Sequence, residues 1–526
     1  MDMTIVDLSR LQFAATAMYH FLFVPLTLGL SLLMAIMESV YVMTGRDIWR
    51  RMTLFWGTLF GINFAMGVAT GIVMEFQFGM NWSYYSHYVG DVFGAPLAIE
   101  GLMAFFLEAT FIGLFFFGWG RMSSVAHLVV TWLTALGANL SALWILIANG
   151  WMQHPVGSTF NPDTMRMEVT DFMAVIFNPV AQAKFVHTVS AGYVTGSMFV
   201  MAISAWFLLK GRHIELAKRS MAVAASFGLA SALSVVVLGD ESGYVATEQQ
   251  KMKIAAMEAM WRTEPAPAPL TVFAIPGDGE NRYEVQIPFL LGLIATRSLT
   301  QELPGIFDLV ERAGERITNG IVAYKALQDI RADRTNTEAR ATLERTWPDL
   351  GYALLLKQYR DDVENATSED IAKAALDTVP NVPVLFWSFR VMVGLGFYFI
   401  AFFGIFFWIA SKQKLGENRK LLWIALFSLP LPWVAIEAGW VVAEYGRQPW
   451  AVEGVLPTFY AASGLTLWDL AISLTFFIVL YTVLAIIMVF LMLKVIRKGP
   501  LDYNPLVEEP AGSSFLPRGA HAGPER

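Results

Sequence analysis

The stretch VHTVSAGYVTGSMFVMAISAWFLL, residues 186–209, contains no aspartate, glutamate, lysine or arginine. Its length exceeds the roughly 20 apolar residues that an α-helix needs to cross the hydrocarbon core of a bilayer. Working outward from this stretch, comparable apolar runs occur at about 14–42, 53–77, 95–119, 124–150, 220–239, 386–410, 421–443 and 467–493. Together these runs predict an all-α integral membrane protein with nine transmembrane helices.

The composition supports this class. Hydrophobic residues make up 56% of the chain and charged residues 15%, whereas soluble domains carry about 25% charged residues. The chain has no cysteine, so a bound metal must be held by His, Met, Glu or Asp. The N-terminus lacks a basic region and a small-residue cleavage site, which predicts that the first span is retained. A net charge of −7 offers no basic patch, and nucleic acid is not expected as a partner.

Lysine and arginine set the predicted orientation. The connection at 78–94 has neither residue, whereas the alternate short connections are basic. Their basic residues are Arg46, Arg50, Arg51, Arg121, Lys210, Arg212, Lys218, Arg219, Lys412, Lys414, Arg419 and Lys420, with Lys494, Arg497 and Lys498 after the last span. Because basic connections remain in the cytoplasm, we expect the N-terminus outside and the C-terminus in the cytoplasm.

One connection is much longer than the others. Residues 241–384 hold 22 acidic and 15 basic residues, a net charge of −7 that equals the net charge of the whole chain. A connection of this length is usually functional or a small subdomain, and we expect an extracytoplasmic insert with mixed strands and helices. The predicted division is therefore helices one to six at 1–240, the insert at 241–384, helices seven to nine at 385–498, and a disordered cytoplasmic tail at 499–526.

Chemically reactive side chains gather near the outer ends of several predicted spans. A charged or titratable group inside a membrane span is costly, so each such group requires a partner or a function. The five residues near the outer ends are His20, Glu100, His187, Met392 and Glu444. Glu108 lies on roughly the same side of the third helix as Glu100 and about 12 Å deeper, at 1.5 Å per residue. Convergence at one membrane depth predicts a cofactor site.

Other polar and sulfur-bearing residues receive plainer interpretations. Most of the 25 methionines must serve as packing. His127 and His213, at cytoplasmic span ends, are interpreted as ordinary interfacial residues, and Glu75 as a side chain that extends toward the membrane surface.

Haem is the cofactor that these residue types suit. A His–Met pair gives a six-coordinate, electron-transferring iron, whereas a single His or a carboxylate leaves a coordination position open for oxygen chemistry. An arginine beside the ligands can pair with haem propionates. From the residues alone, we predict a membrane protein with a redox site on its outer side.

Five longer motifs carry a resemblance to a known family. They are SRLQFAATAMYHFLFVPLTLG (9–29), MEFQFGMNWSYYSHYVGDVFGAPLAIEGLMAFFLE (74–108), KFVHTVSAGYVTG (184–196), GDESGY (239–244) and AGWVVAEYGRQPW (438–450). The chain closely resembles the larger, haem-bearing subunit of bacterial cytochrome bd quinol oxidase, through about residue 500. GRQPW and the run around Glu100 are the most specific of these motifs.

The resemblance implies a role for each candidate ligand. His187 and Met392 would be the axial ligands of a low-spin haem b, and Glu444 would ligate a high-spin haem b. His20 would ligate haem d, where oxygen is bound and reduced. Three further residues are implied at the haem sites: Glu100 faces the haem d iron, Arg390 lies at the edge of the low-spin haem, and Trp440 lies between haems. Arg447, in the GRQPW motif, is assigned to the same cofactor site.

The resemblance also implies a quinol site and a proton route. Lys253 and Glu258 match the quinol-oxidation residues of the insert, which this family calls the Q-loop. Their five-residue spacing is not that of a helical ion pair, so each is expected to be free to face the quinol. Glu108 is expected to pass cytoplasmic protons toward Glu100. Ala109 departs from the serine expected in close relatives, so a hydroxyl there is not essential.

The implied function is a terminal oxidase of the bacterial cytoplasmic membrane that oxidises quinol outside and reduces O2 to water without pumping protons. Its implied partners are ubiquinol or menaquinol, O2, the lipid bilayer, a second large membrane subunit and small single-helix subunits. The alternative is a transporter whose intramembrane acids line an ion path. Alternating access usually leaves inverted repeats, and none is evident in this sequence.

Overall fold

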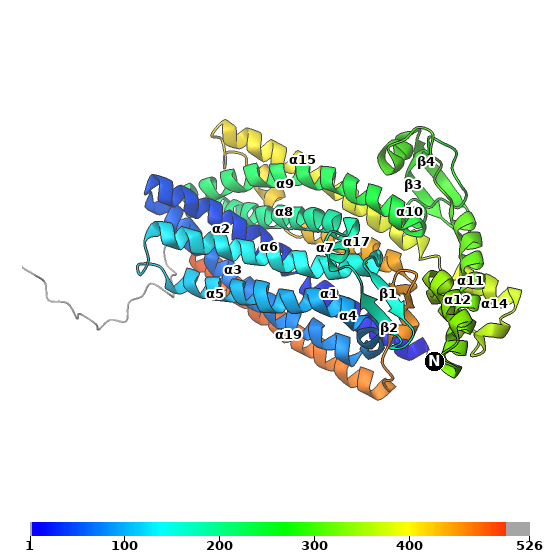
Figure 1. The fold of residues 1–526 in the computed structure, drawn as a ribbon. Coiled ribbons are helices and arrows are strands. Elements are labelled where there is room, and N and C mark those ends of the chain that lie inside the picture. The colour runs from blue at the N-terminus through cyan, green and yellow to red at the C-terminus, as the bar shows by residue number, and fades with distance from the viewer. Residues whose placement is uncertain (1–2, 501–526) are drawn as a thin grey trace, which may run out of the picture.

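The computed structural model of the protein describes residues 3–500, and its main body is a bundle of long helices (Figure 1). Within this described part, nine helical segments are long and apolar enough to cross a membrane, as the sequence predicted. The helices and the hairpin of the insert gather at one end of the bundle, called here the insert end (Figure 1). The predicted tail at 499–526 lies outside the described residues, apart from 499 and 500.

Five of the nine segments are formed largely by one helix and four by two consecutive helices. In chain order they are α1 (Met3–His20) with α2 (Val24–Thr44), α3 (Asp47–Met80), α4 (Ser83–Ile99) with α5 (Phe106–Phe117), α6 (Ser124–Gln153), α7 (Phe172–Ile176) with α8 (Pro179–Leu209), α9 (Ile214–Gln249), α15 (Val382–Ser411), α16 (Arg419–Phe427) with α17 (Leu431–Glu444), and α19 (Leu467–Lys498).

Two of these interruptions fall beside candidate site residues. The first span breaks directly after His20, and α2 resumes with Pro25 in its first turn, where a missing N–H has no helical partner to lose. The third span passes through a π-helix, η1 (Glu100–Phe105), which begins at Glu100. Because π-helical turns are found frequently at functional sites, this local geometry supports a role for Glu100.

Residues 186–209 form most of α8, which lies at the centre of the bundle. In the segment Phe172–Leu209, 78% of the apolar window is buried inside the protein. Small residues allow this burial, because a Cβ built on Gly29 of α2 would lie 2.6 Å from the Cα of Gly196. The two helices therefore cross with their backbones in contact, which explains why this span is rich in glycine, serine and alanine.

Two predicted boundaries are wrong for the same reason. The outer connection expected at 78–94 is mostly helix, since only Asn81 and Trp82 separate α3 from α4. Likewise α9 continues to Gln249, so the insert begins about two helical turns after residue 241. In both places a helix extends beyond its apolar run, where hydropathy alone gives no signal.

The insert contains the predicted mixture of strands and helices. Its elements are α10 (Lys251–Met257), β3 (Leu270–Pro276), β4 (Asn281–Ile287), η2 (Gly292–Thr296), α11 (Ile306–Ala332), α12 (Thr337–Thr346), η3 (Trp347–Asp349), α13 (Leu350–Leu354), η4 (Leu355–Gln358), η5 (Val363–Asn365) and α14 (Ser368–Leu376). β3 and β4 form an antiparallel hairpin. Two further small hairpins lie outside the insert: β1 (Ser158–Asn161) with β2 (Arg166–Val169), and β5 (Trp450–Val452) with β6 (Leu456–Pro457). η6 (Tyr445–Arg447) and α18 (Thr458–Ala461) complete the described elements.

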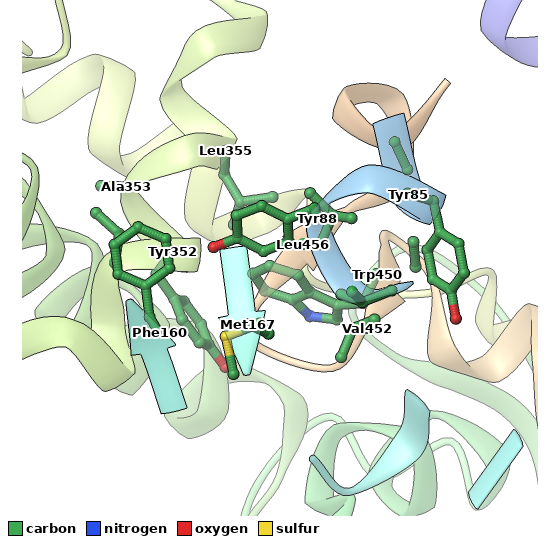
Figure 2. Packing of buried hydrophobic residues seen from close by; sticks show 14 of the residues in the cluster. Tyr85, Tyr88, Phe160, Met167, Tyr352, Ala353, Leu355, Trp450, Val452 and Leu456 are labelled. Carbon is green, nitrogen blue, oxygen red and sulfur yellow. The ribbon is translucent and has the colours of Figure 1, made fainter. Parts of the chain in front are cut away.

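An aromatic cluster joins the helical half of the insert, from α11 to α14, to the bundle (Figure 2). The ring of Tyr352 from α13 lies 4.9 Å from that of Trp450 in β5, and the ring of Tyr88 in α4 lies 6.0 Å from that of Phe160 in β1. All four belong to one buried hydrophobic cluster. The helical half of the insert is therefore held against the bundle through side chains from α4, both small hairpins and α13.

Candidate functional site

His20 lies at the break between α1 and α2. Its Nδ1 is 2.8 Å from Oγ1 of Thr70 on α3. The facing residue is Gly71, where an added Cβ would lie 3.2 Å from Cε1 of the imidazole. Thr70 thus fixes the ring through Nδ1, and no protein group within residues 3–500 is recorded as a hydrogen-bond partner of Nε2. This is the arrangement expected when one imidazole nitrogen is oriented so that the other can bind a metal.

His187 and Met392 are also opposed by glycines. The Nδ1 of His187 is buried without a hydrogen-bond partner among the described residues. A Cβ on Gly239 of α9 would lie 3.0 Å from Cε1 of His187, and a Cβ on Gly439 of α17 would lie 3.0 Å from Sδ of Met392. Glycine therefore leaves space beside each of these two candidate ligands, as it does beside His20.

Trp440 connects the candidate ligand regions of three spans. The ring of Phe21, next to His20, packs edge-on against the Trp440 ring at 4.8 Å. On α8, Nζ of Lys184 lies 5.3 Å from the Trp440 ring centroid. The structure thus brings the region of His20, the fifth span and the eighth span together around one aromatic side chain, consistent with its predicted place between cofactors.

Glu444 accepts hydrogen bonds from four side chains. Its Oε1 accepts from Nδ2 of Asn149 at 3.0 Å, Nε2 of Gln153 at 2.9 Å and Nζ of Lys184 at 3.2 Å. Its Oε2 accepts from Nη2 of Arg447 at 2.7 Å. Two cations and two amides favour the ionised carboxylate. Because Oε2 has one recorded donor within the described chain, it retains capacity for a further interaction.

Glu100 and Glu108 both face α6. Oε1 of Glu100 accepts a hydrogen bond from Oγ of Ser141 at 2.6 Å. Glu108 is 6% exposed, and a Cβ on Gly137 would lie 3.1 Å from the Cα of Glu108. The two acids are thus arranged along one helix–helix contact, as their eight-residue spacing predicted.

Lys253 and Glu258 are not paired with each other, in agreement with their spacing, but the expectation that each is free is wrong. Nζ of Lys253 donates to Oε1 of Gln153 at 2.7 Å, Oε1 of Gln250 at 3.0 Å and the carbonyl oxygen of Ala443 at 2.9 Å. Burial, together with the positive charge of Lys184, lowers the pKa of Lys253 to about 7. Through Gln153, Lys253 is one side chain away from Glu444.

Glu258 is bound to the seventh span. Its Oε2 accepts a hydrogen bond from Nη2 of Arg390 at 2.8 Å, and Nη1 of Arg390 donates to the carbonyl oxygen of Met257 at 2.7 Å. Arg390 also contacts the carbonyl oxygen of Thr271 in β3. Burial raises the pKa of Glu258 above its ordinary value, and the positive charge of Arg390 opposes that rise. A buried acid with a bound cation is suited to exchange a proton.

Sequence reasoning missed three polar residues of this network: Asn149, Gln153 and Lys184. Lys184 had a usable signal, because it lies three residues before His187 and so on the same side of that helix. Asn149 and Gln153 are uncharged residues near the end of a long apolar run, and their role depends on a partner in the distant eighth span.

The interpretation of His127 as an ordinary interfacial residue is wrong. Its side chain is 2% exposed, and Nδ1 lies 2.6 Å from Oε1 of the fully buried Glu38. No local sequence pattern indicates this contact, because Glu38 lies 89 positions away on α2.

The donor set fits haem. His20 and His187 supply imidazole nitrogens, of which Nδ1 of His187 is unpartnered within the described residues, Met392 supplies a thioether sulfur, and a glycine on a neighbouring helix lets each side chain lie where a Cβ would crowd it. Imidazole and thioether are haem-iron ligands. The carboxylate of Glu444 fits as an ionised oxygen donor, and Arg447 and Lys184 compensate its charge.

The nine apolar helical segments of residues 3–500, together with such donors, define an integral membrane protein suited to hold iron porphyrins. The chain belongs to the cytochrome bd terminal oxidase subunit I family, whose model matches residues 8–500.

Relatives with this similarity span nearly the whole chain. It is 53% identical over 498 residues to cytochrome bd-II ubiquinol oxidase subunit 1 of Escherichia coli K12, covering 94% of this chain and 97% of that protein. It is 36% identical over 516 residues to cytochrome bd ubiquinol oxidase subunit 1 of Bacillus subtilis, covering 95% and 97%. The solved bd oxidase of Geobacillus thermodenitrificans shares the fold, with a TM-score of 0.76, 24% identity, and coverage of 94% of this chain and 99% of that chain.

Proposed function

We propose that this protein is the quinol-oxidising, oxygen-reducing subunit of a terminal oxidase. The observation that carries this proposal is the connection from the insert to the candidate iron ligands. Lys253 reaches Glu444 through Gln153, and Glu258 is bound to Arg390, two residues before Met392. Membership of the family, and the names of two relatives as ubiquinol oxidases, favour this function over the transporter alternative.

The quinol head group is proposed to bind between Lys253 and Glu258. Glu258 in its carboxylate form accepts a proton from a quinol hydroxyl, and Arg390 stabilises that carboxylate. Lys253 can donate to the head group when quinol replaces one of its three present hydrogen-bond acceptors, and a lysine whose pKa is lowered to about 7 can also exchange a proton near neutral pH. Either ubiquinol or menaquinol has the hydroxyl groups that this arrangement requires.

Three haems are proposed to be held by the candidate ligands. His187 and Met392, with Arg390, would hold a low-spin haem b; Glu444, with Arg447, would hold a high-spin haem b; and His20, with Glu100, would hold haem d. When bound, these groups supply electron transfer and oxygen reduction. The chain positions their ligands: Thr70 orients the imidazole of His20, and Lys184 and Arg447 keep Glu444 ionised.

The proposed orientation in the membrane determines on which side protons are released and taken up. We infer from the distribution of lysine and arginine that the insert lies outside, in the periplasm, and the C-terminus in the cytoplasm. Protons from quinol are then released outside, whereas Glu108 passes cytoplasmic protons toward Glu100 for the reduction of oxygen to water. One charge is separated per electron without a pump, which generates proton motive force.

The proposed setting is the bacterial cytoplasmic membrane, in a complex with a second large membrane subunit and small single-helix subunits. Exposed apolar faces are compatible with lipid or subunit contacts: in the apolar windows of Ser83–Phe117 and Leu467–Lys498, only 17% of each window is buried within this chain.

A reduced-minus-oxidised absorption spectrum with pyridine haemochrome analysis tests the proposal. We expect bands of low-spin haem b, high-spin haem b and haem d in the purified complex, together with O2 consumption supported by ubiquinol or menaquinol. A preparation that contains the folded chain but no haem would contradict the proposal and return attention to the transporter alternative.

A further inference from the structure

A buried acid–imidazole pair lies at the end of the bundle opposite the insert. Glu38 of α2 and His127 of α6 are 0% and 2% exposed, and Oε1 of Glu38 is 2.6 Å from Nδ1 of His127. The hydroxyl of Thr131, one helical turn further along α6, donates to Oε2 of Glu38 at 2.5 Å. None of these three residues belongs to the candidate haem and quinol sites.

The hydrogen-bond geometry requires a proton between Glu38 and His127. Nε2 of His127 is 2.9 Å from the carbonyl oxygen of Phe115, which can only accept, so Nε2 must donate. In a neutral ring Nδ1 then has no hydrogen, and the short contact needs a proton from the carboxyl group. The alternative is an imidazolium beside a carboxylate. In both forms the pair holds one proton that cannot leave without breaking a hydrogen bond.

An aromatic layer covers this pair on the side of the basic connections. The ring of Trp119 packs against the imidazole of His127 at 3.9 Å, and the guanidinium of Arg50 lies 5.4 Å from the Trp119 ring centroid. The ring of Tyr41 lies 6.4 Å from that of Trp119. Glu38, Tyr41 and Arg50 are thus the titratable or charged groups that α2 and α3 place around His127 and Trp119. The pair is close to the cytoplasmic surface under the proposed orientation, yet shielded from bulk water.

The contact between α5 and α6 leads from this pair to Glu108. Phe115, which receives the Nε2 hydrogen bond, is seven residues after Glu108 and lies on the same face of α5. The axial separation is about 10 Å, at 1.5 Å per residue. On the facing helix, the hydroxyls of Thr131 and Thr134 are both buried, and Gly137 touches Glu108.

We propose that Glu38 and His127 form a proton-loading site that receives protons from the cytoplasmic side and supplies Glu108 along the α5–α6 contact. Thr131 orients the carboxylate of Glu38, and its hydroxyl is the first step toward Thr134. This inference rests on the proposed oxidase function, because a proton supply has meaning only if oxygen is reduced.

The test compares variants of the purified oxidase complex in vesicles. Glu38→Gln and His127→Gln remove the shared proton, whereas Thr131→Val removes a hydroxyl that Thr131→Ser retains. Ser39→Ala is the matched control, because it breaks the neighbouring α2–α6 hydrogen bond that Nε1 of Trp132 donates to Oγ of Ser39 and removes no titratable group. We measure haem content, anaerobic reduction of the haems by quinol, and O2 reduction as a function of pH.

A proton-loading site predicts about tenfold slower O2 reduction in the Gln variants, with a larger loss at alkaline pH, and unchanged haem content and anaerobic haem reduction. Thr131→Val should show a smaller loss in the rate of O2 reduction, and Thr131→Ser should show no such loss. Wild-type turnover and pH dependence in Glu38→Gln would overturn the proposal. If the Gln variants do not assemble, the comparison of Thr131→Val with Thr131→Ser becomes the test. Equal pH profiles of O2 reduction in these two variants would overturn the proposal. A wild-type complex without quinol oxidase activity would instead contradict the proposed function itself.

Discussion

The carboxylate of Glu258 accepts a hydrogen bond from Arg390 at 2.8 Å, and this contact joins the insert to the seventh span. Arg390 precedes Met392 by two residues on α15. Glu258, which is proposed to touch quinol, is therefore bound to the same helical turn that carries Met392, a proposed haem ligand. The side chains of Glu258 and Arg390 are 2% and 13% exposed. Under the proposed function, this buried ion pair keeps the group that accepts the quinol proton close to the first acceptor of the quinol electrons.

Replacement of Glu258 by Gln should therefore impair quinol oxidation. The amide keeps the shape of the side chain but cannot accept the quinol proton, and we expect a loss on the order of 10²-fold in quinol turnover. The three haems should remain in place, because no haem ligand is changed. Glu248→Gln is the control, since Glu248 is exposed near the end of α9. Full quinol oxidase activity in Glu258→Gln would remove Glu258 from the quinol site.

The pH dependence of quinol oxidation should reveal the same carboxylate. Glu258 acts as a base only when ionised, and burial raises its pKa above the ordinary 4.5. As the pH falls through this raised pKa, the fraction of carboxylate and the rate of quinol oxidation both fall. In Arg390→Gln the opposing positive charge is lost, so the acid limb should move to higher pH. Stopped-flow reduction of the haems at several pH values measures this shift, and an acid limb that does not move would contradict the assignment.

Met392 is expected to determine the spin state of one haem. Met392→Leu removes the thioether and should convert the low-spin haem b to a high-spin form, with slower quinol oxidation. The control is Met201→Leu, which replaces a fully buried methionine in the core of α8. An unchanged low-spin spectrum in Met392→Leu would exclude Met392 as a ligand.

The glycine opposite Met392 gives an independent test of the same ligand. In Gly439→Ala the new methyl group would lie 3.0 Å from Sδ of Met392, closer than an ordinary contact, so the sulfur must move. We expect a shifted or weakened low-spin haem band. Gly394→Ala on α15 is the matched control, because a Cβ there meets no atom within 4 Å. Equal spectra for the two alanine variants would argue against a ligand at this position.

The sequence predicted the nine spans, the insert and the clustering of candidate ligands because these features depend on local hydropathy and on helical rise per residue. It did not predict which side chains contact one another. Lys184, Gln153 and Glu38 each act through a residue on a distant helix, and a single sequence does not show which helices are neighbours. Helix ends were displaced for a related reason: α4 and α9 extend into polar segments that tertiary contacts, not hydropathy, keep helical.

The last prediction concerns Glu108, the acid proposed to deliver cytoplasmic protons to the oxygen site. The carboxyl group is nearly fully buried at the α5–α6 contact, between the Glu38–His127 pair and the hydrogen-bonded Glu100. A buried acid without a function is costly in a membrane, so we expect replacement by leucine to block oxygen reduction and to weaken binding of the nearby haems. Glu108→Asp keeps a titratable group and should retain part of the activity, whereas Glu108→Gln keeps the volume without the proton and should not.

Oxygen consumption and external acidification by reconstituted vesicles provide the measurement for these Glu108 variants. Wild-type turnover and acidification in Glu108→Leu would show that protons reach oxygen by another route and that this carboxyl group only packs between helices.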